Sequence, residues 1–297
     1  MSEKTLRACL YFLGAVTVLY FVITLGRGGA GGASAGDSDL AGAFAGIDRE
    51  ALARVDLIGP RETIRLERTG DAWTVNGFEA DSGAVARFLR ALDEVEVGPV
   101  AAANPANHER LGVSTDSAWT LTTDAGTTVL LGKTGNRFRT AYARLPDADQ
   151  VSLIEGDLRA ASARSLFDWR DKVILSADTA AIASIHVARE GETVIYERGD
   201  STWMVGGGGE ADATTVRNIL QELAGLRASG FAPQDAEMPE EPDRAVLALD
   251  ADGIEIASLW LAEQESNFRV SASASPYIFE VPTFRADRVA PAPPDDS

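Results

Sequence analysis

The sequence predicts an α+β protein: an N-terminal transmembrane helix followed by two tandem repeats of a mainly antiparallel β-sheet domain, each with one covering helix. Three observations lead to this prediction. A long apolar run occupies the N-terminus. Further along, the residue pattern of segment 55–75 recurs about 130 positions later, in segment 185–205. Short strand-like segments with Asp/Gly turns follow each of these two segments. The 297 residues are enough for two domains of ordinary size.

The first element is the apolar run 6–25, whose only charged residue is Arg7. About 20 apolar residues cross a bilayer, whereas the core of a signal peptide has about 7–15. Because Lys4 and Arg7 are basic, the positive-inside rule predicts a single-pass signal anchor in the cytoplasmic (inner) membrane. The N-terminus would lie in the cytoplasm and the C-terminal body outside it, in the periplasm. Ala33-Ser34-Ala35 leaves cleavage of the segment open, although it lies well beyond the apolar core.

A glycine-rich stretch follows the run and is predicted to be a flexible tether. It contains a G-x-S-x-G pattern around Ser34, but neither flank predicts the strand-to-helix elbow that a hydrolase needs. The whole chain is then divided as follows: 1–27 cytoplasmic tip and anchor, 28–48 tether, 49–156 first repeat, 157–178 connecting segment, 179–290 second repeat, 291–297 disordered tail.

The repeat itself begins with two strands in each copy. The segments 55–75 and 185–205 share an E-T pair, an E-R pair and a W-x-V end. The matched residues are Glu62-Thr63 with Glu192-Thr193, Glu67-Arg68 with Glu197-Arg198, and Trp73 with Trp203. Similarity at one fixed spacing indicates duplication.

An amphipathic helix follows each strand pair. Its apolar residues are spaced three and four apart, which places them on one face. They are Val85, Phe88, Leu89, Leu92 and Val95 in the first copy, and Val216, Ile219, Leu220, Leu223 and Leu226 in the second. Asp81 and Asp212 precede these helices, where a carboxylate caps free backbone N–H groups.

The remainder of each copy predicts a meander of four strands. The predicted strands are 119–123, 127–131, 138–145 and 150–154 in the first copy, and 245–249, 254–261, 268–274 and 277–281 in the second. Asp124-Ala125-Gly126 and Ala251-Asp252-Gly253 are predicted hairpin turns, since Asp and Gly tolerate the backbone angles required.

These features in this order resemble the bacterial domain-of-unknown-function family 4340. The resemblance rests on the anchor, the strand pair 62–73, the helix, the stretch from Asn104-Pro105 to Leu111-Gly112-Val113, the meander and the run Leu166-Phe167-Asp168-Trp169-Arg170-Asp171-Lys172. It implies a single-pass membrane protein with repeated domains, encoded beside an ABC-2-type transporter. It supplies no catalytic residues.

The composition argues against several classes of function. The net charge of −18 lies almost entirely after the N-terminal segment and is opposite to that of a nucleic-acid binder. Cys9, the single cysteine, lies within the apolar run, and no Walker-type lysine loop occurs. We therefore predict no catalytic residues, no cofactor and no metal site, and a protein that is not an enzyme.

Several residues allow both a structural and a functional interpretation. His186 is predicted to be an exposed strand residue and His108 a loop residue, neither with a second ligand at metal spacing. The acidic residues 235–243 indicate a solvated loop, with a weak calcium site as the alternative. Trp73 and Trp203 are predicted to pack in the cores, with sugar stacking as the alternative.

One group of cations stands out against the acidic body. Arg137, just before the predicted strand 138–145, and Arg139, within it, would share one strand face by alternation, with Lys133 and Arg144 nearby. The hypothesis is a patch that docks an acidic partner: Lys133, Arg137, Arg139 and Arg144.

Three functions remain open. The first is a non-catalytic, membrane-anchored extracytoplasmic accessory protein of an ABC-2-type transporter or envelope complex, with an ABC permease as its partner and the bilayer contacted through the N-terminal helix. The second is an envelope protein that binds a glycan or a lipid-derived ligand in a groove between the copies. The third is a hydrolase with a carboxylate pair in a cleft.

Overall fold

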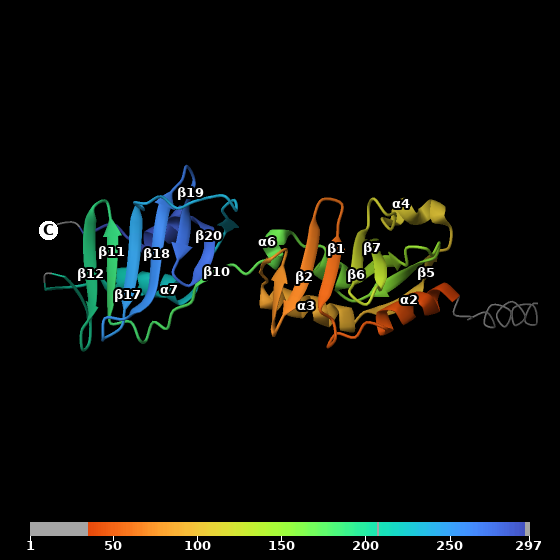
Figure 1. Cartoon of the computed structure of the whole chain (residues 1–297), viewed down its shortest axis with the longest axis horizontal. Helices are drawn as coiled ribbons and strands as arrows, with labels where there is room; N and C mark the ends of the chain where they lie inside the picture. Colours follow the sequence, from red (N-terminus) through yellow and green to blue (C-terminus); the bar gives the residue numbers. More distant parts are fainter. Residues whose placement is uncertain (1–34, 207, 295–297) are drawn as a thin grey trace, which may run out of the picture. The chain divides into compact units, whose positions relative to one another are not determined.

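The computed structural model describes residues 35–206 and 208–294. The chain divides between Trp169 and Arg170 into two compact units, unit 1 and unit 2 below (Figure 1). The predicted anchor 1–27 and Ser34 lie outside the described residues. Within those residues, no helix is long and apolar enough to cross a bilayer.

Unit 1 is built on one nine-stranded antiparallel sheet with the order β4-β3-β2-β1-β6-β7-β8-β9-β5. The strands are β1 (Arg54–Ile58), β2 (Thr63–Thr69), β3 (Ala72–Val75), β4 (Phe78–Glu79), β5 (Glu96–Ala102), β6 (Trp119–Thr123), β7 (Thr128–Thr134), β8 (Thr140–Arg144) and β9 (Val151–Glu155). The predicted meander is β6 to β9. Gly126 closes its first hairpin with φ = 87°, a conformation that glycine adopts without steric cost.

Unit 2 contains a nine-stranded antiparallel sheet with the order β14-β13-β12-β11-β17-β18-β19-β20-β16. The strands are β11 (Ser184–Arg189), β12 (Glu192–Arg198), β13 (Trp203–Val205), β14 (Gly209–Glu210), β16 (Gly230–Phe231), β17 (Arg244–Leu249), β18 (Glu255–Glu263), β19 (Asn267–Ala272) and β20 (Ser275–Pro282). Matched strand for strand, this is the order of unit 1, as duplication requires. A short pair, β10 (Val173–Leu175) with β15 (Leu226–Arg227), is added to it.

The two predicted amphipathic helices are α3 (Ser82–Asp93) and α7 (Ala213–Gly225), and both begin at the predicted caps. Asp81 Oδ1 accepts a hydrogen bond from the Ala84 backbone N–H at 2.7 Å, and Asp212 Oδ1 accepts one from Thr215 N–H at 2.7 Å. Their apolar faces are buried against the sheets, so Phe88 and Ile219 are completely inaccessible.

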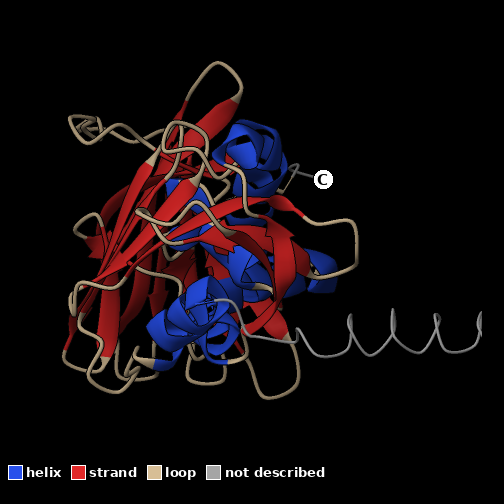
Figure 2. Cartoon of the chain, turned by 90° about the vertical axis from the view of Figure 1, so that its right-hand side faces the viewer, coloured by secondary structure: helices blue, strands red, loops and turns tan. Residues whose placement is uncertain are grey.

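The prediction of one covering helix per repeat was too simple. Figure 2 shows extended sheets with several helices packed against them. The additional helices are α2 (Ala35–Ala45), α4 (His108–Leu111), α5 (Leu158–Ser162) and α6 (Leu166–Trp169) in unit 1, and α8 (Thr283–Val289) in unit 2. The segment 157–178 thus contributes α5 and α6 to unit 1 and β10 to unit 2.

Part of the predicted tether is also ordered. Residues 35–45 form α2 instead of a flexible spacer, and Leu40 and Phe44 are buried in the core of unit 1. These two residues lie four apart, one turn of helix, and so reach the same surface. Burying both side chains contributes several kcal/mol, which outweighs the helix penalty of about 1 kcal/mol at Gly42.

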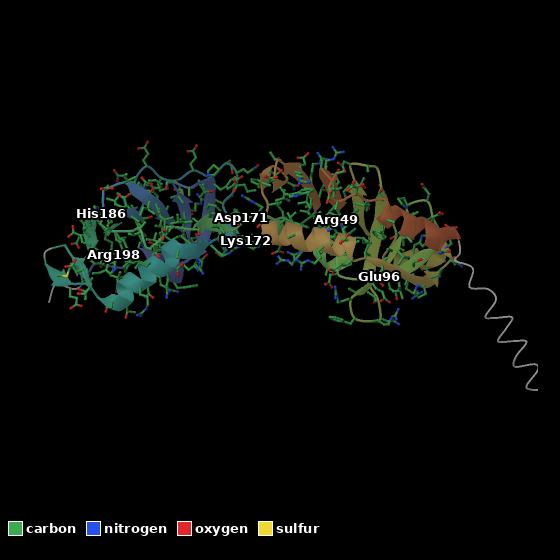
Figure 3. All side chains as sticks on the ribbon, turned by 90° about the horizontal axis from the view of Figure 1, so that it is seen from below. Arg49, Glu96, Asp171, Lys172, His186 and Arg198 are labelled. Atoms are coloured by element: carbon green, nitrogen blue, oxygen red, sulfur yellow. The ribbon has the colours of Figure 1, made fainter. Side chains whose placement is uncertain are left out.

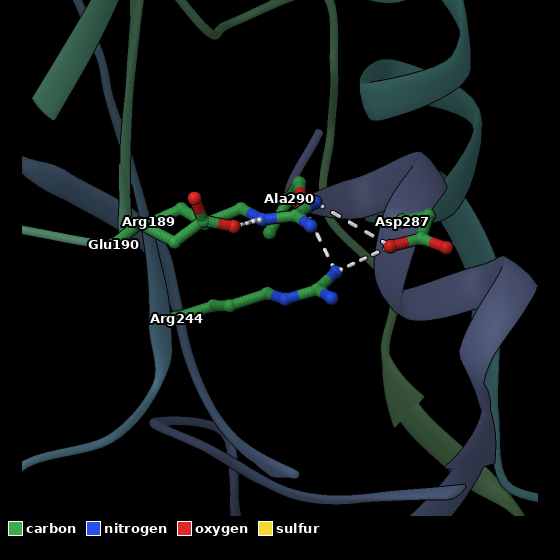
Figure 4. A network of polar contacts seen from close by, with 5 residues as sticks. All are labelled: Arg189, Glu190, Arg244, Asp287 and Ala290. Carbon is green, nitrogen blue, oxygen red and sulfur yellow. Dashed lines mark hydrogen bonds and ion pairs between the residues drawn. The ribbon is translucent and has the colours of Figure 1, made fainter. Parts of the chain in front are cut away.

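A polar network fastens α8 to the sheet of unit 2 (Figure 4). Arg189 on β11 lies directly opposite Arg244 on β17, a pairing of like charges that is unfavourable by itself. Both guanidinium groups reach Asp287 Oδ1, at 3.4 Å and 2.7 Å, and both donate to the Ala290 carbonyl at the end of α8. The shared carboxylate and the negative end of the helix offset the repulsion.

The cap at Asp212 gives a prediction about acid stability. Its hydrogen bonds to Thr215 lower the pKa of Asp212 below its ordinary value of 3.8. A carboxylate with a lowered pKa stabilises the fold above the pKa of the unfolded chain, and this contribution is lost as pH falls through the folded pKa. Asp212→Ala should therefore lower the urea midpoint of unit 2 at neutral pH, and the difference from wild type should shrink steadily below about pH 4. Midpoints measured across this range for both proteins check it, and a difference that is independent of pH contradicts it.

Candidate functional site

The predicted cationic docking patch is not assembled as expected, and Arg144 shows why. It is the last residue of β8 and only 7% exposed. Its guanidinium group donates to the carbonyls of Val113, Leu145, Pro146 and Ala148, at 2.6–3.2 Å. Burial lowers the pKa of Arg144. Arg144 therefore fastens two loops of unit 1 and offers no charge to a partner.

Arg137 and Arg139 do not share a strand face either, because β8 begins only at Thr140. They lie in the β7–β8 hairpin loop, and each is paired with a carboxylate: Arg137 with Glu155 at 3.1 Å and Arg139 with Asp157 at 2.8 Å. The residue between them, Phe138, is 91% exposed. The hairpin thus projects an aromatic ring between two neutralised cations. Lys133, on β7, donates to the Arg110 carbonyl.

The two histidines belong to different units. His186, on β11, alternates with the buried residues Ile185 and Val187 as predicted, but it is half-buried and not exposed (it is labelled in Figure 3). His108 begins α4 and its Nε2 lies 2.7 Å from the Asp149 carbonyl oxygen. In residues 35–206 and 208–294, no group of three or more His, Cys, Asp or Glu is arranged to hold a metal ion.

Unit 2 contains a groove between the helix α7 and the strands β13 and β14, called the Trp203 groove here. Its volume is about 430 Å³. Half of its lining is apolar and half is polar. The lining residues are Ala211, Ala213, Val216, Leu220, Ala224 and Trp203, together with Thr179, Ser201, Thr202, Glu210, Arg217 and Gln221. Such a size is typical of small-molecule sites.

The two repeated tryptophans support the packing interpretation, since both are half-buried against the cores of their units. Trp203 has a second environment, because its side chain also lines the groove. The Arg198 guanidinium group lies 5.0 Å from the centroid of the Trp203 ring, and it donates to the Thr179 and Ala180 carbonyls at 2.7 and 3.3 Å. This arrangement fixes the indole ring against β12.

Comparison of the two copies shows one difference at the groove. Thr179 and Ala224, on opposite sides of it, correspond to Arg49 and Asp93 in unit 1. There the Arg49 Nε and Asp93 Oδ1 atoms form an ion pair at 3.0 Å (Arg49 is labelled in Figure 3). Sequence reasoning missed the groove; the signal that could have found it was this pair of large, charged residues replaced by small ones.

The junction run 166–172 contributes to both units. Trp169 is fully buried in the core of unit 1, with its ring edge-to-face against Phe88 at 5.8 Å. Arg170 is 9% exposed in unit 2, with its guanidinium group 3.4 Å from the centroid of Phe231 and 5.3 Å from that of Tyr277. Burial lowers the pKa of Arg170. The run is therefore explained by packing.

Comparison with models of known protein families gives a match. A family model described as "Domain of unknown function (DUF4340)" matches residues 73–245, more than half of the chain. The match runs from Trp73 on β3 to the start of β17, so it includes the junction and parts of both units. No curated protein and no solved structure matches the chain.

Proposed function

The chain belongs to the DUF4340 family, and from that premise we propose that it is a non-catalytic, membrane-anchored extracytoplasmic accessory protein of an ABC-2-type transporter or a related envelope complex. The apolar run 6–25 anchors it, with the N-terminus in the cytoplasm and the acidic body outside. The body binds a membrane protein partner, an ABC permease.

The observation that carries this proposal is the β7–β8 hairpin of unit 1. Both arginines of its loop are paired with Glu155 and Asp157, and Phe138 between them is 91% exposed. An aromatic side chain at the surface offers a large apolar contact, and only two side-chain torsions lose their freedom when it is buried. A net charge of −18 disfavours an anionic lipid surface as the target, which favours an apolar pocket on a protein.

Affinity purification from native membranes in mild detergent tests the proposal. We expect an ABC permease and its ATPase to be retained with the wild-type protein. Phe138→Asp should reduce their recovery by about 10-fold or more, because it places a charge in an apolar contact. Ile254→Asp is the matched control, since Ile254 is an exposed apolar residue of a turn in unit 2, and it should leave recovery unchanged. Recovery of the protein without transporter subunits would overturn the proposal.

A second candidate function is the binding of a small ligand from the envelope, and the Trp203 groove favours it. The groove is formed within unit 2, so the two candidates can be tested separately: Phe138 variants address the partner, and variants of the groove address the ligand.

A further inference from the structure

We propose that the Trp203 groove binds a neutral glycan by stacking one pyranose ring on Trp203. The inference rests on the second candidate function, ligand binding, and names the class of ligand. It does not depend on a transporter partner.

The first argument is the size and shape of the site. About 430 Å³ accommodates one or two sugar rings and falls within the range of known ligand pockets. The apolar residues Val216, Leu220 and Ala213 come from one side of α7, and Trp203 faces them from β13. A pyranose ring, which carries C–H groups on one face, fits between these two walls.

The second argument is that the aromatic wall is fixed before any ligand arrives. Trp203 pairs with Arg198 in the antiparallel register of β12 and β13, and the Arg198 guanidinium group lies over its ring. Arg198 is held in turn by the Thr179 and Ala180 carbonyls. A ring fixed in this way binds without a further loss of side-chain entropy. The C–H groups of a pyranose ring pack against such an indole face.

The third argument is the chemistry of the rim. Ser201 and Thr202 offer hydroxyl groups, Glu210 accepts hydrogen bonds, and Arg217 donates them. Gln221, whose Oε1 accepts from Arg288 Nη2 at 2.8 Å, adds amide N–H donors. Sugar hydroxyls satisfy both kinds of group, whereas an acyl chain would remove them from water without replacing their hydrogen bonds.

The charges select a neutral ligand. The lining holds one carboxylate, Glu210, and one guanidinium group, Arg217, so its formal charges cancel. The surrounding body is strongly acidic and repels polyanions. Uncharged glycans meet no electrostatic penalty at this site.

Unit 1 suggests the substitutions that test whether the groove is the binding site. In unit 1, Arg49 and Asp93 form an ion pair at the positions of Thr179 and Ala224. The double substitution Thr179→Arg with Ala224→Asp transfers this pair to unit 2 and should close the groove. Trp203→Ala removes the stacking surface, and Trp73→Ala is its control in the other repeat.

The experiment uses the full-length protein in lipid nanodiscs, free of sugar-based detergents, and titrates N,N′-diacetylchitobiose and maltose by calorimetry. At least one of these glycans should bind to the wild type and to Trp73→Ala. Affinity should fall by about 10-fold or more in the double variant and in Trp203→Ala. Hydrogen exchange confirms that each variant is folded.

Two results would overturn the inference. If neither glycan binds, or if the closing pair leaves binding unchanged, the groove is not a glycan site. If lysophosphatidylcholine binds instead and the closing pair abolishes its binding, the ligand class is wrong while ligand binding itself stands. Recovery of the permease with the closed variant, measured in parallel, keeps the partner proposal separate.

Discussion

Replacing Trp169 by alanine is expected to lower the free energy of unfolding of unit 1 by about 3–5 kcal/mol. The indole is fully buried, packs edge-to-face on Phe88 and fills space that the surrounding sheet and α3 cannot easily reclaim. Its Nε1 has no hydrogen-bond partner among the described residues, so the loss comes from packing and from the contact with the Arg164 guanidinium group, 5.9 Å from the ring centroid. Trp169→Ala is thus among the largest single-residue effects that we expect in the described residues.

Hydrogen exchange followed by mass spectrometry at increasing urea concentration checks this prediction and resolves the units. Peptides of unit 1 should lose protection at lower urea in Trp169→Ala, and those of the β17–β19 region should not change. Phe138→Ala is the matched control, since this exposed aromatic should alter stability by no more than about 0.5 kcal/mol. Equal losses in the two units, or a loss below about 1 kcal/mol in unit 1, would count against the packing role assigned to Trp169.

Glu222→Ala is expected to destabilise unit 2 by about 2–3 kcal/mol. Glu222 is 3% exposed on α7, and its carboxylate oxygens lie 3.3 Å from Arg285 Nη1 and 3.2 Å from Arg288 Nη1 on α8. The Arg285 Nη1 atom is buried with no hydrogen-bond partner in the described part of the chain, so removing the carboxylate leaves its charge uncompensated. Because both arginine side chains are about a third exposed, the cost is below that of a fully buried pair.

Urea denaturation of Glu222→Ala, Arg288→Ala and the double variant measures this effect. The double variant should lose less than the sum of the single variants, since both substitutions break the same contact. Glu265→Ala, at an exposed loop carboxylate, is the control and should stay within about 0.5 kcal/mol of wild type. Strict additivity would show that the Glu222–Arg288 ion pair contributes no stability.

Local signals made much of this fold predictable. An Asp cap and an apolar stripe predict the helices α3 and α7. Asp/Gly turns between segments of alternating polarity predict the hairpins. All of these signals lie within a few residues of the structure they specify. The repeat predicted that the two sheets would share one architecture.

Other elements depend on distant partners and escaped prediction. β5 contains Gly98 and Pro99, which weaken its strand pattern, and it forms because β9 pairs with it from far along the chain. The amphipathic pair Leu40 and Phe44 of α2 was hidden by neighbouring glycines. These elements exist because of tertiary contacts that no local pattern reports.

The candidate site shows the same division. A count of charges identified Lys133, Arg137, Arg139 and Arg144, but it could not show that carbonyl groups enclose Arg144 or that acids from β9 and the following turn neutralise Arg137 and Arg139. The burial of Glu222 could not be predicted for the same reason, since its partners Arg285 and Arg288 come from α8, far along the chain. Thr179 and Ala224 line the Trp203 groove, and neither residue type by itself indicates a binding site. Their interest appears only when they are compared with Arg49 and Asp93 at the same positions of unit 1.

The most direct test of the central claim, that this body docks on a membrane transporter, is site-specific photocrosslinking from position 138 in native membranes. The account predicts a crosslink to a polytopic ABC permease when the photoreactive residue replaces Phe138, and none when it replaces Ile254. A folded, membrane-bound protein that crosslinks at position 138 only to lipid, or to nothing, would contradict it.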